Sequence, residues 1–560
     1  MDKGLTMRAV RSIPPGDRPA GNVCGTRSIA MARRGMVATS QALASASGLA
    51  VLQEGGNAID AAVTAAAVLS VIEPTMTGVG GDLFALVHDA RDGAVHALNA
   101  SGRTGRGASS ARLREHGLTR LPSRGALSVT VPGAVAGWVD LLARHGTIPL
   151  SRALAPAIAY AREGFPVAEI AAGQWQDAEA VLAADPHAAS VFLPRGRAPR
   201  AGEVFANPLL AATLERVAHG GVDGFYRGPV ASAIASRLAA DGGLVDEVDL
   251  GAHATDWVTP IRTTFRGCEV FEMPPNTQGF VALEMLNILE HDDLEGLGHN
   301  TGAYLHLLVE AARVAFADRD AHLSDAAWFS AGALETLTSK AYAGERRRGI
   351  DASRAATEVR AWVAPSRASG PVASPPSAAG DTVYLAAADS RGNAVSLVQS
   401  LFECFGSAVV VPGTGVVLQN RGSLFVLDET HPNRLGANKR PMHTLIPAMV
   451  FRDGQLWLSF GVMGGDLQPQ GHVQVLVNLL AFGMNLQEAG EAARIRYAPA
   501  GVAVESGVSR EARAGLAGRG HTVIETSGVF GGFQGILVDS GTGVLMGGSD
   551  PRKDGLAIGH

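Results

Sequence analysis

The stretch SPPSAAGDTVYLAAADSRGNAV, residues 374–395, joins a loose tether to a strand pattern. From Thr382 onward an apolar run, a polar DSRGN turn and a returning apolar run predict a β-hairpin. The preceding residues 363–380 are rich in Pro, Ser, Ala and Gly, a composition that buries little apolar area and predicts a flexible linker. Strand propensity alone explains a threonine at the junction, and an inter-domain linker explains the tether equally well.

Three further hairpin patterns occur at residues 83–98, 448–460 and 535–548, each with two apolar runs around an Asp- and Gly-rich turn. A long helical region separates the first pattern from the others. It includes one apolar helical face, formed by Leu305, Leu308, Val309, Ala312 and Phe316. Strands at both ends of the chain with helices between them predict two stacked antiparallel sheets with helices outside, an α/β layered sandwich.

Composition excludes several classes of protein. The chain has 560 residues, 46% hydrophobic and 18% charged, which suits one large layered fold or two domains. A net charge of −6 offers no basic field, so we expect no nucleic-acid partner. Cys24, Cys268 and Cys404 lie far apart and indicate reduced thiols. No apolar signal segment begins the chain, and the apolar run 61–72 is shorter than the ~20 residues of a membrane span. We therefore expect a cytoplasmic protein without a membrane partner.

Common catalytic and cofactor motifs are missing from the sequence. It contains no G-x-S-x-G, H-E-x-x-H or P-loop pattern, and the glycine cluster TGVGGD at residues 77–82 lacks the third glycine of a dinucleotide fingerprint. We therefore expect no cofactor. His291, His299 and His306 follow one another at spacings of eight and seven, which fit no metal motif. We expect them to be solvated or capping histidines, and we expect no metal.

A hydroxyl nucleophile without a histidine base remains. Threonine can use its own α-amine as the base, but only as the first residue of a chain. The α-amine has a reference pKa of about 7.7–8.0, which suits general-base work near neutrality. If the Thr382 hydroxyl cut the bond between Asp381 and Thr382, it would create that chain end, and the flexible tether would let the old end move away.

Nine stretches, in order, resemble the γ-glutamyltranspeptidases (glutathione hydrolases) and their acylase relatives, over about residues 35–555. They are MVATSQALASASGLAVLQEGGNAIDAAVTAAAVLSVIEPTMTGVGGD, NASGRTG, SVTVPGAVAGW, FEMPPNTQGFVALEMLNILE, GDTVYLAAADSRGNAVS, CFGSAVVVPGTGVVLQNRG, NKRPMHTLIPAMV, GVMGGD and GGSDPRKDG. The resemblance implies a four-layer αββα N-terminal-nucleophile hydrolase. It also implies self-cleavage into a large subunit, residues 1–381, and a small subunit, residues 382–560. The two would stay intertwined in one fold as a heterodimer, and a higher oligomer is left open.

The resemblance assigns roles to individual positions. Thr382 matches the nucleophile, and Ser400 stands where the family has a threonine whose hydroxyl binds it. Gly464 and Gly465 match the glycines whose N–H groups form the oxyanion hole. Arg103 matches the arginine that clamps the substrate's carboxylate with its guanidinium fork. Without the resemblance, the glycine pair would be interpreted as a turn and Arg103 as a solvated surface side chain.

The positions that hold a γ-glutamyl group in the family differ here. Phe402, Arg421 and Leu424 replace an asparagine, a glutamine and an aspartate. His443 and Thr444 replace a pair of serines. Removing one member of a buried charge pair costs roughly 2–5 kcal/mol, so losing the aspartate argues against efficient recognition of a substrate ammonium.

We therefore expect an amidohydrolase that cleaves a small-molecule amide with a carboxylate-bearing acyl group through an acyl-enzyme. This resembles the family branch of cephalosporin (glutaryl or aminoadipyl) acylases and oxamate amidohydrolases. Arg103, helped by Arg421, would hold the carboxylate. One alternative is a γ-glutamyl hydrolase or transferase proper. Another, from a different class, is a binding protein without turnover, but such a protein would have no need to retain Thr382, Ser400 and the glycine pair.

Overall fold

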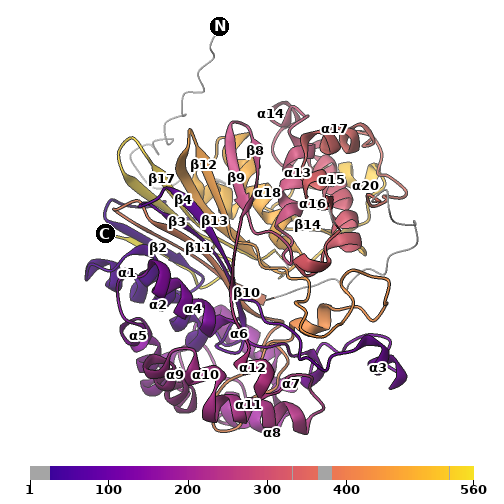
Figure 1. Ribbon diagram of the computed structural model, residues 1–560. Helices are drawn as coiled ribbons and strands as arrows, with labels where there is room; N and C mark the ends of the chain where they lie inside the picture. The colour runs from indigo at the N-terminus through magenta and orange to yellow at the C-terminus, as the bar shows by residue number, and fades with distance from the viewer. Residues whose placement is uncertain (1–25, 331, 364–380, 527, 529) are drawn as a thin grey trace.

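Two stacked seven-stranded sheets form the centre of the computed structural model, which describes residues 26–330, 332–363, 381–526, 528 and 530–560 (Figure 1). All strand pairs within these two sheets are antiparallel. In order across the first sheet, the strands are β19 (Leu556–Gly559), β2 (Gly35–Thr39), β10 (Asp381–Asp389), β11 (Ala394–Phe402), β3 (Asp82–Asp89), β4 (Ala94–Asn99) and β7 (Asp256–Val258). The second sheet has the order β1 (Ala30–Ala32), β18 (Val544–Ser549), β17 (Gly532–Asp539), β13 (Gln455–Met463), β12 (Ala448–Arg452), β9 (Cys268–Glu272) and β8 (Ile261–Phe265).

Helices cover the outer face of each sheet. Figure 1 shows α1, α2 and α4 on one side of the stacked sheets and α13, α15 and α18 on the other. The helices on the side of the first sheet are α1 (Ala42–Gln53), α2 (Ala58–Ile72), α3 (Ser110–Glu115), α4 (Ala134–His145), α5 (Leu150–Glu163), α6 (Glu169–Asp177), α7 (Glu179–Ala183), α8 (Pro186–Phe192), α9 (Pro208–Gly220), α10 (Asp223–Tyr226), α11 (Gly228–Ala240) and α12 (Glu247–Gly251). The remaining helices are α13 (Gly279–Leu289), α14 (Leu294–Leu297), α15 (Gly302–His322), α16 (Ala333–Leu337), α17 (Lys340–Arg348), α18 (Leu467–Leu480), α19 (Leu486–Glu491) and α20 (Arg510–Gly518).

Short elements complete the described part of the chain. They are the 3-10 helices η1 (Ala126–Ser128), η2 (Ala326–Trp328) and η3 (Arg421–Leu424), the ribbon β5 (Phe165–Pro166) with β6 (Val204–Phe205), and the small sheet β14 (Ile495–Ala498), β15 (Gly501–Val504) and β16 (Val523–Glu525). None of the helices in the described ranges is long and apolar enough to cross a membrane.

Alternation along β10 shows how the layers are held together. Val383, Leu385 and Ala387 pack into the apolar cluster that contains α1, α2 and α4. Tyr384 and Ala386 belong to the cluster between the two sheets. Successive residues of a strand point to opposite faces, so one strand contributes to both layers. Side chains of α13, α15 and α18 form the third cluster against the second sheet. The four layers confirm the predicted αββα fold.

The local predictions also hold. The four predicted hairpins are β3–β4, β10–β11, β12–β13 and β17–β18. The predicted apolar helical face lies on α15, and the apolar run 61–72 lies in α2, whose residues are all buried. Asn57 and Asp60 cap the start of α2 with reciprocal side-chain-to-backbone hydrogen bonds. The predicted linker, apart from Val363, lies outside the described residues, as does Cys24.

Each main sheet mixes strands from both sides of the predicted cleavage site. β2, β3, β4 and β7 come before Thr382 in the chain, yet they share a sheet with β10, β11 and β19. The second sheet likewise combines β1, β8 and β9 with four later strands. Two pieces produced by a cut at Asp381–Thr382 would remain joined by strand pairing and by the three apolar clusters described above. The cut itself stays a prediction.

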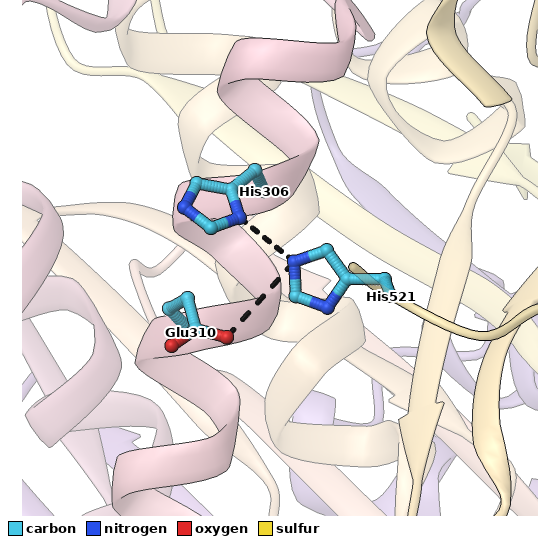
Figure 2. A group of neighbouring side chains, drawn as sticks. All are labelled: His306, Glu310 and His521. Atoms are coloured by element: carbon cyan, nitrogen blue, oxygen red, sulfur yellow. Dashed lines mark hydrogen bonds and ion pairs between the residues drawn. The ribbon is translucent and has the colours of Figure 1, made fainter. Parts of the chain in front are cut away.

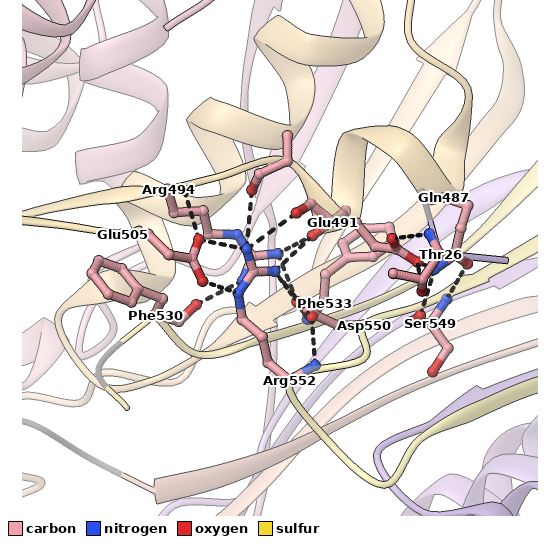
Figure 3. A network of polar contacts seen from close by, with 12 residues as sticks. Thr26, Gln487, Glu491, Arg494, Glu505, Phe530, Phe533, Ser549, Asp550 and Arg552 are labelled. Carbon is pink, nitrogen blue, oxygen red and sulfur yellow. Dashed lines mark hydrogen bonds and ion pairs between the residues drawn. The ribbon is translucent and has the colours of Figure 1, made fainter. Parts of the chain in front are cut away.

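A buried polar network fastens the C-terminal GGSDPRKDG stretch (Figure 3). Arg494 Nη2 donates to Asp550 Oδ2 at 2.8 Å, and Phe533 N–H donates to the same oxygen at 2.9 Å. Arg552 bonds to Asp550 Oδ1 at 3.0 Å and to Glu505 Oε1 at 2.7 Å. Although burial raises the pKa of Asp550, Arg494 and Arg552 hold it below its usual value. The carboxylate is therefore charged and fully engaged.

We expect the Asp550→Ala substitution to lower the free energy of unfolding by about 3–5 kcal/mol, because it leaves the buried Arg494 guanidinium without its carboxylate. Denaturant unfolding of the purified protein measures this. Glu358→Ala is the matched control, since it removes the partner of the highly exposed Arg360 and should leave the midpoint nearly unchanged. Equal midpoints for the two variants would contradict a stabilising role for the network.

Candidate active site

Thr382 and Ser400 meet at the start of the β10–β11 hairpin. The pairing of β10 with β11 is irregular between Asp381 and Val383, and Thr382 lies at this irregularity. The Thr382 hydroxyl donates to Ser400 Oγ at 3.3 Å, and both side chains are buried. The structure therefore brings together the predicted nucleophile and its predicted hydroxyl partner.

Ser400 Oγ also accepts two N–H groups. The backbone N–H of Phe402 donates to it at 2.7 Å, and Arg421 Nη2 donates to it at 3.0 Å. Phe402 ends β11 with φ 85°, a left-handed conformation that is uncommon for a residue other than glycine. This backbone turn at the strand end accompanies the short bond back to Ser400.

Arg421 is a buried cation beside this pair. Its Nη1 donates to Thr444 Oγ1 at 2.8 Å, and its Cζ lies 4.4 Å from the centre of the Phe402 ring. Burial lowers the pKa of Arg421 to about 9, so the side chain remains charged at neutral pH. Of the residues expected to depart from the family pattern, Phe402 and Arg421 contact Ser400, and Thr444 contacts Arg421. Leu424 packs in the same apolar cluster as Phe402.

His443 belongs to a second buried pair, with Asp82. His443 Nε2–H donates to Asp82 Oδ2 at 3.2 Å, and its Nδ1 accepts the N–H of Leu445 at 3.3 Å. Burial raises the pKa of Asp82 to about 7, and burial together with Arg421 holds the pKa of His443 well below its usual value. Asp82 stands opposite Ser400 in the β3–β11 pairing. Sequence reasoning missed Asp82, although it closes the TGVGGD stretch at the start of a predicted strand.

The glycines of that stretch allow close backbone packing beside Ser400. A Cβ added to Gly80 would lie 2.1 Å from the Val417 carbonyl oxygen, and one added to Gly81 would lie 2.5 Å from the carbonyl oxygen of Ser400. Any larger residue would therefore push this backbone away from β11.

Gly464 and Gly465 form the turn between β13 and α18. Their φ angles of 119° and 59° are strained for residues with a side chain. Gln278 Nε2 donates to the carbonyl oxygens of Gly465 at 3.1 Å and Thr444 at 2.9 Å. Arg319 donates in turn to Gln278 Oε1 at 3.0 Å. Among the described residues, no acceptor is found for the N–H of either glycine. Sequence reasoning also missed Gln278, which lies in the quoted PPNTQGF stretch.

Arg103 shares two carboxylates with Arg440. Arg103 is partly exposed and donates to Asp325 Oδ2 at 3.1 Å and to Asp256 Oδ2 at 3.3 Å. The backbone N–H of Arg440 donates to the same Asp325 oxygen at 2.8 Å, and its guanidinium bonds to Asp256. The positive charge of Arg103 is therefore already paired with two carboxylates. Its role as a carboxylate clamp stays a prediction.

The expectation for His306 is wrong, because this side chain is fully buried and hydrogen-bonded (Figure 2). His306 Nε2–H donates to the carbonyl oxygen of Asp351 at 2.7 Å, so its Nδ1 accepts from His521 Nε2–H, also at 2.7 Å. Glu310 lies 3.9 Å from the same nitrogen of His521. The three side chains could gather around a metal ion. However, two nitrogen ligands on tetrahedral zinc lie roughly 3.3 Å apart, so the observed spacing is that of a direct hydrogen bond.

Comparisons with known proteins bear on the fold and the family of this chain. The family model for gamma-glutamyltranspeptidase matches residues 44–560. The "glutathione hydrolase-like YwrD proenzyme" of Bacillus subtilis is 39% identical over 535 residues, covering 94% of this chain and 98% of that protein. The "oxamate amidohydrolase proenzyme" of Klebsiella pneumoniae is 36% identical over 543 residues, covering 94% and 98%. The crystal structure of a cephalosporin acylase from Bacillus halodurans superposes with a TM-score of 0.89 at 39% identity, covering 99% of both chains. With its stacked sheets and its buried threonine–serine pair, the chain belongs to the γ-glutamyltranspeptidase family of N-terminal-nucleophile hydrolases.

Proposed function

We propose that this protein is a self-maturing amidohydrolase, in which Thr382 becomes the first residue of its chain and attacks the amide of a carboxylate-bearing acyl group. The observation that carries the proposal is the buried contact between Thr382 Oγ1 and Ser400 Oγ, directly after the predicted linker. The names of two similar proteins support it, since both are called proenzymes and one is an amidohydrolase. The similar cephalosporin acylase structure supports acyl-amide chemistry.

The reaction follows from the groups at the site. Thr382 Oγ1 attacks the amide carbonyl carbon while the Thr382 α-amine accepts the hydroxyl proton. The N–H groups of Gly464 and Gly465 donate to the oxyanion of the tetrahedral intermediate. The α-ammonium then protonates the leaving amine, and an ester of Thr382 remains. Water attacks this ester with the same amine as base, which releases the acid and restores Thr382. In the uncut chain the amine is part of a peptide bond, so turnover depends on the cut.

The acyl group is proposed to end in a carboxylate and to lack a free ammonium, as in glutaryl or oxamate amides. Leu424 is buried in an apolar cluster at the position where the family has an acid for the substrate's ammonium. Arg103 is the proposed clamp, because it is the more exposed of the two arginines that share Asp256. A γ-glutamyl hydrolase is the second candidate, favoured by the similarity to a glutathione hydrolase-like protein.

Maturation is tested by mass spectrometry and N-terminal sequencing of the purified protein. We expect two polypeptides, the smaller beginning at Thr382. Thr382→Ala should remain uncut because it has no hydroxyl. Thr382→Ser should be cut slowly because it loses the methyl group that restricts the rotamer. A single full-length species with undiminished amidase activity would refute this mechanism.

The oxyanion hole is tested with Gly465→Val. We expect kcat to fall about 10²–10³-fold with a much smaller change in KM, the usual result of losing one oxyanion donor. Gly454→Val is the control, because Gly454 has a φ of 74° in the β12–β13 turn and no neighbour near its absent side chain. This control carries similar backbone strain but should keep its kcat. Equal losses of kcat in the two variants would mean that Gly464 and Gly465 form an ordinary turn and not an oxyanion hole.

Substrate choice is tested with a glutaryl and a γ-glutamyl amide of the same amine, which differ only by the α-ammonium group. We expect a higher kcat/KM for the glutaryl amide, because an ammonium group would be buried near Arg421 without an acid. Leu424→Asp should shift the preference toward the γ-glutamyl amide, and its melting temperature shows whether it folds. Arg103→Ala should raise KM for both. A wild-type preference for the γ-glutamyl amide would favour the second candidate instead.

A further inference from the structure

Ser400 Oγ accepts hydrogen bonds from a buried cation and from the backbone at the same time. A serine oxygen has two lone pairs and one hydrogen. The Phe402 N–H and Arg421 Nη2 approach Ser400 Oγ at 2.7 and 3.0 Å, whereas the Thr382 hydroxyl approaches at 3.3 Å. The two N–H groups therefore make the shorter contacts to Ser400 Oγ, and they hold this oxygen in place beside the Thr382 hydroxyl.

Arg421 is held in place for this contact. One Nη atom donates to Ser400, and the other donates to Thr444 Oγ1 at 2.8 Å. The Phe402 ring covers the guanidinium at 4.4 Å, and the side chain has no exposed surface. No ion pair to Arg421 occurs within the described ranges, where the nearest acids act on it only at longer range. Its charge is therefore directed at the two hydroxyls it contacts. Charge-assisted hydrogen bonds of this kind are about twice as strong as neutral ones.

We propose that Arg421 is a positioning residue for the Thr382–Ser400 pair, and not a second clamp for the carboxylate of the substrate. The inference rests on the proposed function, in which Thr382 Oγ1 is the nucleophile. When Oγ1 attacks, its proton passes to the α-amine and negative charge develops on the oxygen. The Ser400 hydroxyl, polarised by Arg421 and Phe402 N–H, turns to donate to Oγ1. Ser400 and Arg421 keep their protons throughout. They therefore stabilise the negative charge on Thr382 Oγ1 without changing their own protonation state.

The two possible roles of Arg421 predict different kinetics. A carboxylate clamp acts only on substrates that carry a carboxylate, and its loss raises KM. A positioning residue acts on every reaction of the Thr382 hydroxyl, including reactions with reagents that lack a carboxylate. Arg421→Gln separates the two roles, because glutamine is shorter and neutral and leaves Ser400 without its cationic donor.

The first measurement is the reaction of mature protein with phenylmethanesulfonyl fluoride, a neutral reagent. Thr382 Oγ1 forms a bond to sulfur, fluoride leaves, and the α-amine takes the hydroxyl proton. We expect Arg421→Gln to slow this reaction about 10–100-fold, the range for losing one hydrogen bond to a charged group. Arg421→Lys should recover part of the rate because it restores a cation. Arg360→Gln, the same change at a highly exposed arginine, is the matched control and should react like the wild type.

The second measurement is steady-state hydrolysis of a glutaryl amide. We expect Arg421→Gln to lower kcat by a similar factor with KM within about threefold, whereas Arg103→Ala should raise KM. Melting temperatures of all variants show whether the fold is kept. If Arg421→Gln folds, reacts with the neutral reagent at the wild-type rate and raises only KM, Arg421 is a clamp and the inference is overturned. If Thr382→Ala retains hydrolytic activity, the proposed function fails, whatever Arg421 does.

Discussion

The pairing of β10 with β11 is the contact on which the rest of the structure depends. These strands occupy the middle of their sheet, flanked by β2 and β3, and β10 sends alternate side chains into two apolar clusters. An irregularity at the first residues of β10 frees Thr382 from the regular ladder while keeping it against Ser400. Such irregularities re-aim side chains beside active sites. One hairpin therefore contributes both to the hydrophobic core and to the proposed catalytic pair.

Burial favours the neutral form of each ionisable group around this hairpin, but the groups respond differently. It drives Asp82 and His443 toward their neutral forms, since one pKa rises to about 7 and the other falls well below its usual value. Arg421 has a pKa near 9 and stays charged. Ser400 is buried away from solvent. A fixed cation there interacts more strongly with a developing oxyanion than it would in water. Phe402 and Thr444, two of the positions expected to differ from the γ-glutamyl-binding pattern, contact this cation.

The mixed origin of the strands would keep the two pieces together after the proposed cut before Thr382. Strands from both sides of residue 382 alternate within each sheet, and the apolar clusters contain side chains from both sides. Breaking one peptide bond removes none of these contacts. The Arg494–Asp550 network adds a polar anchor that ties the C-terminal stretch to residues near α19 and β15. We therefore expect the fold to persist after the proposed cut.

The sequence by itself predicted the layered fold and the four hairpins and, through its resemblance to the family, the candidate roles of Thr382, Ser400 and the glycine pair. Alternating apolar residues, turn residues and the order of motifs are patterns that can be recognised in the sequence alone. Only the tertiary structure decided which groups meet: Arg421 with Ser400, Asp82 with His443, Arg103 with Asp256, and His306 with His521. These partners are separated by 21 to 361 residues, and no spacing rule relates them. Burial and hydrogen-bond partners arise only when the layers pack together. They decide whether an arginine is placed to bind substrate or to support a nucleophile.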